Sequence, residues 1–132
     1  MLDNEIIKFK KVLQQTIEKK AMYEKNIEEL ENVIEFMKSD LVVIKENDNI
    51  DTIILKAYVE NGSMPLTCNY MNEKGYKVPS PTGGRKYTIK DISDIVSDFE
   101  NKNIDSKLKS IVRTVYTYKS LSSYGKLKIK EF

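Results

Sequence analysis

The clearest pattern in this chain is a repeat of core-type residues at alternating spacings of three and four, from Ile6 to Ile44. Such spacing places side chains on one narrow stripe of an α-helix, and a sustained seven-residue repeat is typical of a left-handed coiled coil. We call this stripe the a/d seam; with Ile6 at position a, its members are Ile6, Phe9, Leu13, Thr16, Lys20, Tyr23, Ile27, Leu30, Ile34, Met37, Leu41 and Ile44. A long helix cannot bury such a stripe alone, so the seam predicts that residues 1–45 form an oligomerisation helix.

Two polar residues in the middle of the seam indicate the number of helices. A lysine at a buried a position, here Lys20, costs stability but favours small oligomers, because two lysines reach solvent from a dimer more easily than four from a larger core. In a parallel pair, Lys19 would also face Glu24 of the second copy. We therefore expect a homodimer. The residues that flank the seam include the apolar Val12, Ile17 and Val33, which widen the apolar stripe. They leave open an antiparallel pair, a four-helix assembly or packing on the chain's own C-terminal domain.

A different pattern begins after the seam. Residues 46–51 are polar and rich in Asn and Asp, which favour turns and helix N-caps, so we expect a linker there. The remaining residues, 52–132, predict a small domain with a basic C-terminal helix and tail. Its helices are expected over about 51–59, 66–72, 88–99 and 105–120.

Glycine, proline and hydroxyl residues set the boundaries of these helices. Gly62 and Gly75 are expected to end the first two, and Thr88 with Asp91 forms a capping box for the third. The Pro- and Gly-rich stretch 76–87 predicts a short β-hairpin. The predicted fold class is mainly α, with a long N-terminal coiled-coil helix followed by a small helix-turn-helix-like domain that carries a short β-hairpin.

Composition argues against most catalytic and metal chemistry. The chain has no histidine and a single cysteine, Cys68, so it lacks the commonest general base, the commonest zinc ligand and any internal disulfide. Gly83 and Gly84 precede Arg85 and Lys86, but the phosphate-loop spacing is missing. We expect a non-enzyme with no catalytic residue, no cofactor and no metal.

Charge and hydropathy indicate the cellular compartment of the chain. The net charge is +2, but residues 105–132 carry seven basic and two acidic side chains. The longest aliphatic run, 41–44, is too short to span a bilayer, and no secretion signal opens the chain. One cysteine suits a reducing compartment. We expect a cytoplasmic protein without a membrane partner.

Two segments of the predicted domain together form one motif. Residues 70–79 read YMNEKGYKVP, and residues 82–88 read TGGRKYT, followed by Ile92 and Ile95. Together they resemble the pattern L-N-x-x-G-x-x-x-P … G-G-x-W/Y-[ST] … V/I-x-x-I/L in the DNA-binding part of large serine recombinases and related phage or mobile-element regulators. The resemblance covers residues 52–99 and no catalytic domain.

The resemblance implies a DNA-binding regulator of phage or mobile-element type that acts as a coiled-coil dimer. In that family a helix ends at the motif glycine, the loop follows the DNA backbone, and the next helix enters the major groove. Arg85 and Lys86 would then contact phosphates, while Lys90 and Ser93 approach base edges. The residues expected to contact DNA are Lys74, Lys77, Arg85, Lys86, Lys90, Ser93, Arg113 and Lys119.

Acidic residues on the third predicted helix favour an alternative. Asp91, Asp94 and Asp98 lie on the side away from its core stripe, where DNA phosphates would repel them. Such a face suits a non-enzymatic interaction protein that binds and inhibits a host protein. The same role could use the widened stripe of the long helix.

Overall fold

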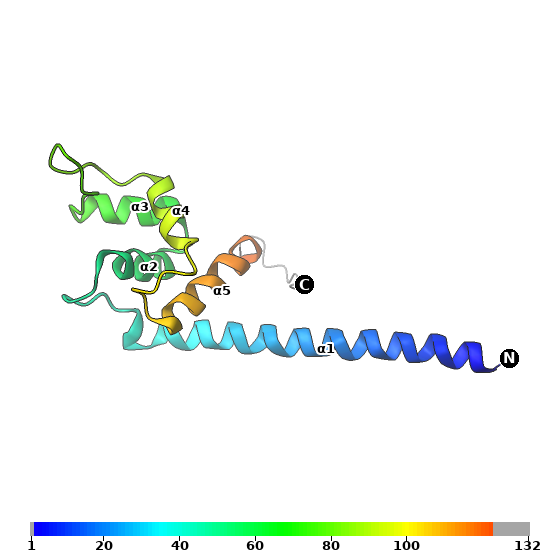
Figure 1. Ribbon diagram of the computed structural model, residues 1–132. Helices are drawn as coiled ribbons and strands as arrows, with labels where there is room; N and C mark the ends of the chain where they lie inside the picture. Colours follow the sequence, from blue (N-terminus) through cyan, green and yellow to red (C-terminus); the bar gives the residue numbers. More distant parts are fainter. Residues whose placement is uncertain (1, 123–132) are drawn as a thin grey trace.

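The computed structural model describes residues 2–122, and for residues 119–122 the backbone alone. Its elements are α1 (Leu2–Lys38), the 3₁₀ helix η1 (Asp40–Val42), α2 (Ile50–Asn61), α3 (Met64–Glu73), α4 (Ile89–Val96) and α5 (Ser106–Ser122). Helices α2 to α5 form a small domain on the C-terminal half of α1, whose N-terminal half projects away from it (Figure 1). The predicted mainly α chain with a long first helix is confirmed.

Side-chain caps and glycines start and stop the helices of the domain. The side chains of Asn49 and Ser63 accept hydrogen bonds from backbone N–H groups in the first turns of α2 and α3. Gly62, at φ 76°, follows α2, and Gly75, at φ 85°, follows α3. Both adopt the left-handed conformation that glycine tolerates best, as the sequence predicted.

The core of the domain surrounds α2. This helix packs against α3, α4 and α5, and its residues 53–59 are all buried. The largest fully buried side chains are Tyr58, Ile54, Met71, Ile92, Val96, Val112 and Thr67. The loop before α5 is tied to the start of α2, because Asn49 Nδ2 donates to the Asn103 carbonyl and Asn101 Nδ2 donates to Asp51. Within the described chain, no helix is both long enough and apolar enough to cross a membrane.

The long helix ends earlier than the seam predicted. α1 stops at Lys38, and the chain turns at Ser39, whose hydroxyl donates to the Phe36 carbonyl and accepts from the Leu41 N–H. Two expected seam members, Leu41 and Ile44, therefore lie beyond the helix. The expected span 1–45 was too long because the apolar spacing continues past a residue that caps η1 instead.

The expected linker 46–51 is held on the domain by hydrogen bonds. Lys56 Nζ, on α2, donates to the Val43 carbonyl at 2.9 Å and to Asp48 Oδ2 at 2.7 Å. The same Asp48 oxygen accepts the Lys45 backbone N–H at 2.8 Å. This junction joins the end of α1 to α2.

The short β-hairpin is not seen, and this prediction was wrong. Among the described residues there is no strand; Val78 and Arg85 form an isolated antiparallel bridge with two backbone hydrogen bonds. Pro79 and Pro81 lack the N–H groups that would extend the ladder. The third predicted helix is also shorter than expected, since α4 ends at Val96 and not at Phe99.

Candidate nucleic-acid interface

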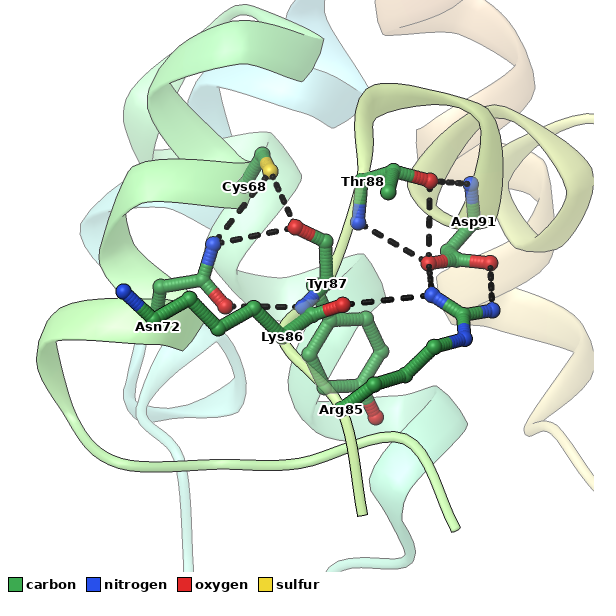
Figure 2. A network of polar contacts seen from close by, with 7 residues as sticks. All are labelled: Cys68, Asn72, Arg85, Lys86, Tyr87, Thr88 and Asp91. Carbon is green, nitrogen blue, oxygen red and sulfur yellow. Dashed lines mark hydrogen bonds and ion pairs between the residues drawn. The ribbon is translucent and has the colours of Figure 1, made fainter. Parts of the chain in front are cut away.

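The loop between α3 and α4 is the candidate site, and an asparagine holds its return segment. Asn72 Oδ1 accepts the Tyr87 N–H at 2.8 Å, and Asn72 Nδ2 donates to the Tyr87 carbonyl at 3.0 Å (Figure 2). Cys68 Sγ donates to the same carbonyl at 3.2 Å. Burial of the Tyr87 ring raises the pKa of its phenol. One residue is therefore fixed by both backbone groups and its ring, which sets where the loop rejoins the domain.

A second network fixes the start of α4. Thr88 and Asp91 form the predicted capping box, with Asp91 Oδ2 accepting the Thr88 N–H at 2.9 Å. Arg85 donates to both carboxylate oxygens of Asp91, at 2.7 and 2.8 Å (Figure 2). The hydrogen bonds from Arg85 and from the Thr88 backbone hold the pKa of the Asp91 carboxyl far below its usual value. Asp91 thus joins the loop to the helix.

The shape of the loop depends on a close approach between two backbone segments. At Gly84, φ is 113°, and an added Cβ would lie 3.0 Å from the Cβ of Lys77. Ser80 Oγ accepts the Gly84 N–H at 3.1 Å, next to the Val78–Arg85 bridge. Only glycine fits this position without moving the opposite segment. The loop is therefore a defined structure that projects from the domain (Figure 1).

Basic residues flank the tip of the loop on both sides. Residues 74–90 contain five basic and no acidic side chains: Lys74, Lys77, Arg85, Lys86 and Lys90. All five are exposed. Arg85 is the member whose charge is paired; within residues 2–122, none of the four lysines forms an ion pair, and Lys74 Nζ lies 5.8 Å from the centre of the Tyr70 ring. Four cations without an ion pair therefore lie between the end of α3 and the first turn of α4.

The first turn of α4 continues this basic surface, but its later turns do not. Lys90 is exposed at the start of the helix, whereas Ser93 is only partly exposed. Asp94, one turn after Lys90, is exposed and lies on the same outward face. An anionic ligand could therefore approach the N-terminal end of α4 but would be repelled further along.

The other two expected DNA contacts lie on α5. Arg113 is exposed, and its guanidinium carbon lies 4.7 Å from the centre of the Phe99 ring, which meets Tyr116 edge-on. Lys119 belongs to the last turns of α5, and its side chain lies outside the described residues, as does the expected basic tail 123–132. Five of the expected residues lie between the end of α3 and the first turn of α4, whereas Arg113 belongs to a separate aromatic contact.

The a/d seam remains on the surface of α1. Its exposed members within the helix are Ile6, Phe9, Leu13, Thr16, Lys20, Tyr23, Ile27, Ile34 and Met37, while Leu30 is partly exposed. The residues of α1 that face the domain follow another stripe, which we call the domain-facing stripe: Met22, Asn26, Glu29, Val33 and Phe36. The alternative in which the long helix packs on its own domain is thus realised in part, without covering the seam.

Sequence reasoning missed the supporting residues of the loop. Asn72 was present in the motif but had no expected role, and Asp91, expected as a capping residue and as part of an acidic face, also pairs with Arg85. The sequence contained a signal for the structural role of Asp91, because a residue at N3 of a capping box already hydrogen-bonds to the start of its own helix. Among the residues that the structure describes, no group of three or more His, Cys, Asp or Glu side chains could hold a metal.

Comparison with known proteins leaves the family open. No protein-family model, no curated protein and no solved structure matches this chain.

Proposed function

We propose that this chain is a DNA-binding regulator whose α3–α4 loop contacts the phosphate backbone. The observation that carries the proposal is the concentration of unpaired cations on residues 74–90, in a loop fixed by Asn72 and by the Arg85–Asp91 pair. A loop that is already ordered loses little conformational entropy on binding, so its lysines are presented at low cost. The resemblance to recombinase DNA-binding segments supports the same function.

The roles of individual residues in this proposal follow from their contacts. Lys77 and Lys86 contact phosphates, and Lys90 approaches base edges from the first turn of α4. Arg85 keeps its bidentate bond to Asp91 and positions the loop. The homodimer expected from the a/d seam belongs to the proposal, because two copies would present two loops to one duplex.

The alternative, a protein that inhibits a host protein through an acidic face, has less support. Asp91 is occupied by Arg85 and by the cap of α4, and Asp98 Oδ1 accepts the Glu100 N–H. Asp94 is then the one aspartate of the three without a hydrogen bond or ion pair among the described residues. Asp94 and Asp98 are exposed and form no ion pair among the described residues, so this face offers two carboxylates against the four lysines of residues 74–90.

The affinity for a fluorescent DNA duplex, measured by titration with the protein at several salt concentrations, tests the proposal. Between about 50 and 200 mM salt, the affinity of the wild-type chain should fall steeply, because phosphate contacts release counterions. The Lys77→Ala, Lys86→Ala variant should bind all sequences more weakly and lower the salt slope by about two units. Lys90→Ala should weaken the preferred site by about 1–3 kcal/mol and affect other sequences less.

A charge-matched control separates the loop from general basicity. Lys8→Ala with Lys11→Ala removes the same charge from the projecting half of α1 and should leave the salt slope unchanged. Thermal melting should show that each variant folds, because the altered side chains are exposed. If the wild-type chain shows no salt-sensitive DNA binding at low ionic strength, the proposal is wrong and the acidic residues of α4 become the next site to examine.

A further inference from the structure

The N-terminal half of α1 is a helix without a neighbour among residues 2–122. Every residue from 2 to 21 is exposed, and the helix leaves the domain as a straight rod (Figure 1). One side of this rod is apolar, with Leu2, Ile6, Phe9 and Leu13 lining a shallow surface groove. An amphipathic helix of this length normally buries its apolar stripe against another helix.

The C-terminal half of α1 shows that its own domain does not cover the seam. The domain-facing stripe follows c and g positions of the heptad, whereas the seam follows a and d. At 100° per residue, the centres of these two stripes lie about 110° apart around the helix. Ile27, Ile34 and Met37 accordingly stay exposed beside the buried domain contacts. Within the described residues, the seam is therefore exposed from Leu2 to Met37 except at Leu30, which is partly covered.

We infer that two copies of this chain pair through the a/d seam as a parallel, in-register coiled coil. In that register each seam residue meets the same residue of the second copy, so apolar residues contact apolar residues. The polar residues Thr16 and Lys20 likewise each meet their own counterpart. The inference specifies the dimer of the proposed function, but it does not rest on DNA binding.

Charges beside the seam match this register. In a parallel pair, a g residue faces the e residue five positions later in the second copy. Glu5 then faces Lys10, Lys19 faces Glu24, and between them Val12 faces Ile17, so the flanks of the free half contain opposite charges or apolar pairs. No like-charge pair arises between positions 5 and 24.

Lys20 is already directed toward the flank. Its Nζ lies 3.8 Å from Glu24 Oε1 of the same helix, and most of the side chain is exposed. In the paired state this ammonium can remain at the e flank, beside Glu24, while its aliphatic stem lies across the seam. This outward direction of the Lys20 side chains lowers the desolvation and repulsion cost of placing two cations at one level of the coiled coil.

The exposed area is sufficient for a stable dimer. Ten large apolar side chains on or beside the seam are at least one-third exposed: Leu2, Ile6, Phe9, Val12, Leu13, Ile17, Tyr23, Ile27, Ile34 and Met37. If each loses about 80 Å² of accessible surface, two copies bury roughly 1,600 Å², which is the size of a standard specific interface. Because the domain covers the g residues Asn26 and Val33, the flanking g–e contacts form in the free half of α1, and the domains flank the C-terminal half of the helix pair.

Sedimentation measures the association. At about 50 µM, a range in which such zippers pair, the full chain should sediment as a dimer of 15.3 kDa subunits. Phe9→Asp with Leu13→Asp should give a monomer, and both side chains are mostly exposed in their own copy. Asn4→Asp with Gln15→Asp adds the same charge on the opposite face and should remain dimeric. A monomeric wild-type chain would overturn the inference.

Oxidative cross-linking measures the orientation. In a Cys68→Ser background, Phe9→Cys and Met37→Cys, made separately, should each form a disulfide between copies, because equivalent d residues meet along a parallel pair. Lys11→Cys, at an outward f position, should not cross-link. A dimer in which Phe9→Cys or Met37→Cys fails to cross-link would overturn the parallel register. Loss of DNA binding with an intact dimer would affect only the proposed function.

Discussion

Neighbouring apolar residues near the end of α1 differ sharply in solvent exposure. Val33 is 8% exposed and Phe36 is 4% exposed, because they contact the domain, whereas the next residues, Ile34 and Met37, are 53% and 45% exposed. All four are apolar, so hydrophobicity alone does not decide which face is buried within the chain. One helix therefore carries two apolar faces, one buried against the domain and one left exposed by the described residues.

The largest expected effect comes from placing the same charge on each of the two faces. Val33→Asp buries a carboxylate in the contact with the domain and should destabilise the chain by about 3 kcal/mol or more. Ile34→Asp should change the unfolding free energy of the protomer by at most about 0.5 kcal/mol, since its side chain already meets solvent. Urea unfolding in the Phe9→Asp, Leu13→Asp background isolates the protomer. Equal losses for both variants would contradict the two-face assignment.

An intermediate effect is expected at the junction between α1 and the domain. Burial by itself raises the pKa of the Asp48 carboxyl, but hydrogen bonds from the Lys45 N–H and from Lys56 hold it below its ordinary value of 3.8. Because the folded-state pKa is the lower one, this contribution to stability is complete above about pH 4 and is lost as pH falls through the folded pKa. Asp48→Asn should cost about 2 kcal/mol at neutral pH.

The matching control for the junction is Asp40→Asn, which removes an exposed carboxylate from η1. Its unfolding free energy should stay within about 0.5 kcal/mol of the wild type. Acid unfolding followed by circular dichroism should show a smaller loss of stability below pH 4 for Asp48→Asn than for Asp40→Asn. A full acid-dependent loss in Asp48→Asn would assign that loss to other carboxyls, with the Asp91 pair first.

The smallest effect is expected at Lys20 and concerns the dimer alone. Lys20→Ile should stabilise the paired helices by about 1 kcal/mol, because it replaces a polar layer with an apolar one, and it should favour a larger assembly. The melting temperature of concentrated samples and their sedimentation measure both changes. Lys11→Ile, on the outward face, is the control and should alter neither. No change for Lys20→Ile would place position 20 outside the interface.

Local signals predicted most of the domain. Ser63, Thr88 with Asp91, Gly62 and Gly75 mark the ends of α2, α3 and α4 because each satisfies backbone groups within a few residues. Such bonds depend on little beyond the adjacent sequence. The early end of α1 was missed because the apolar spacing continues to Ile44, while the cap formed by Ser39 is a single residue.

Features that depend on distant contacts could not be predicted in the same way. The domain-facing stripe contains Asn26 and Glu29, so its polarity hides it from any search for apolar periodicity. The bond between Asn72 and Tyr87 joins residues 15 apart across a loop whose path the sequence does not specify. The basic loop was found from the motif and its lysines, but the pairing of Arg85 with Asp91 needed three-dimensional geometry.

The projecting half of α1 has a consequence for the secondary structure of the chain. Twenty residues, 2–21, extend roughly 30 Å beyond the domain contacts, and none of them is buried by the part of the chain that the structure describes. A lone helix of this length is only marginally stable in water, because its nucleation is costly and its propagation gains little. Helix–coil equilibrium in this arm is therefore linked to protein concentration. Dilution should lower the helical signal at 222 nm by melting the arm while the domain stays folded.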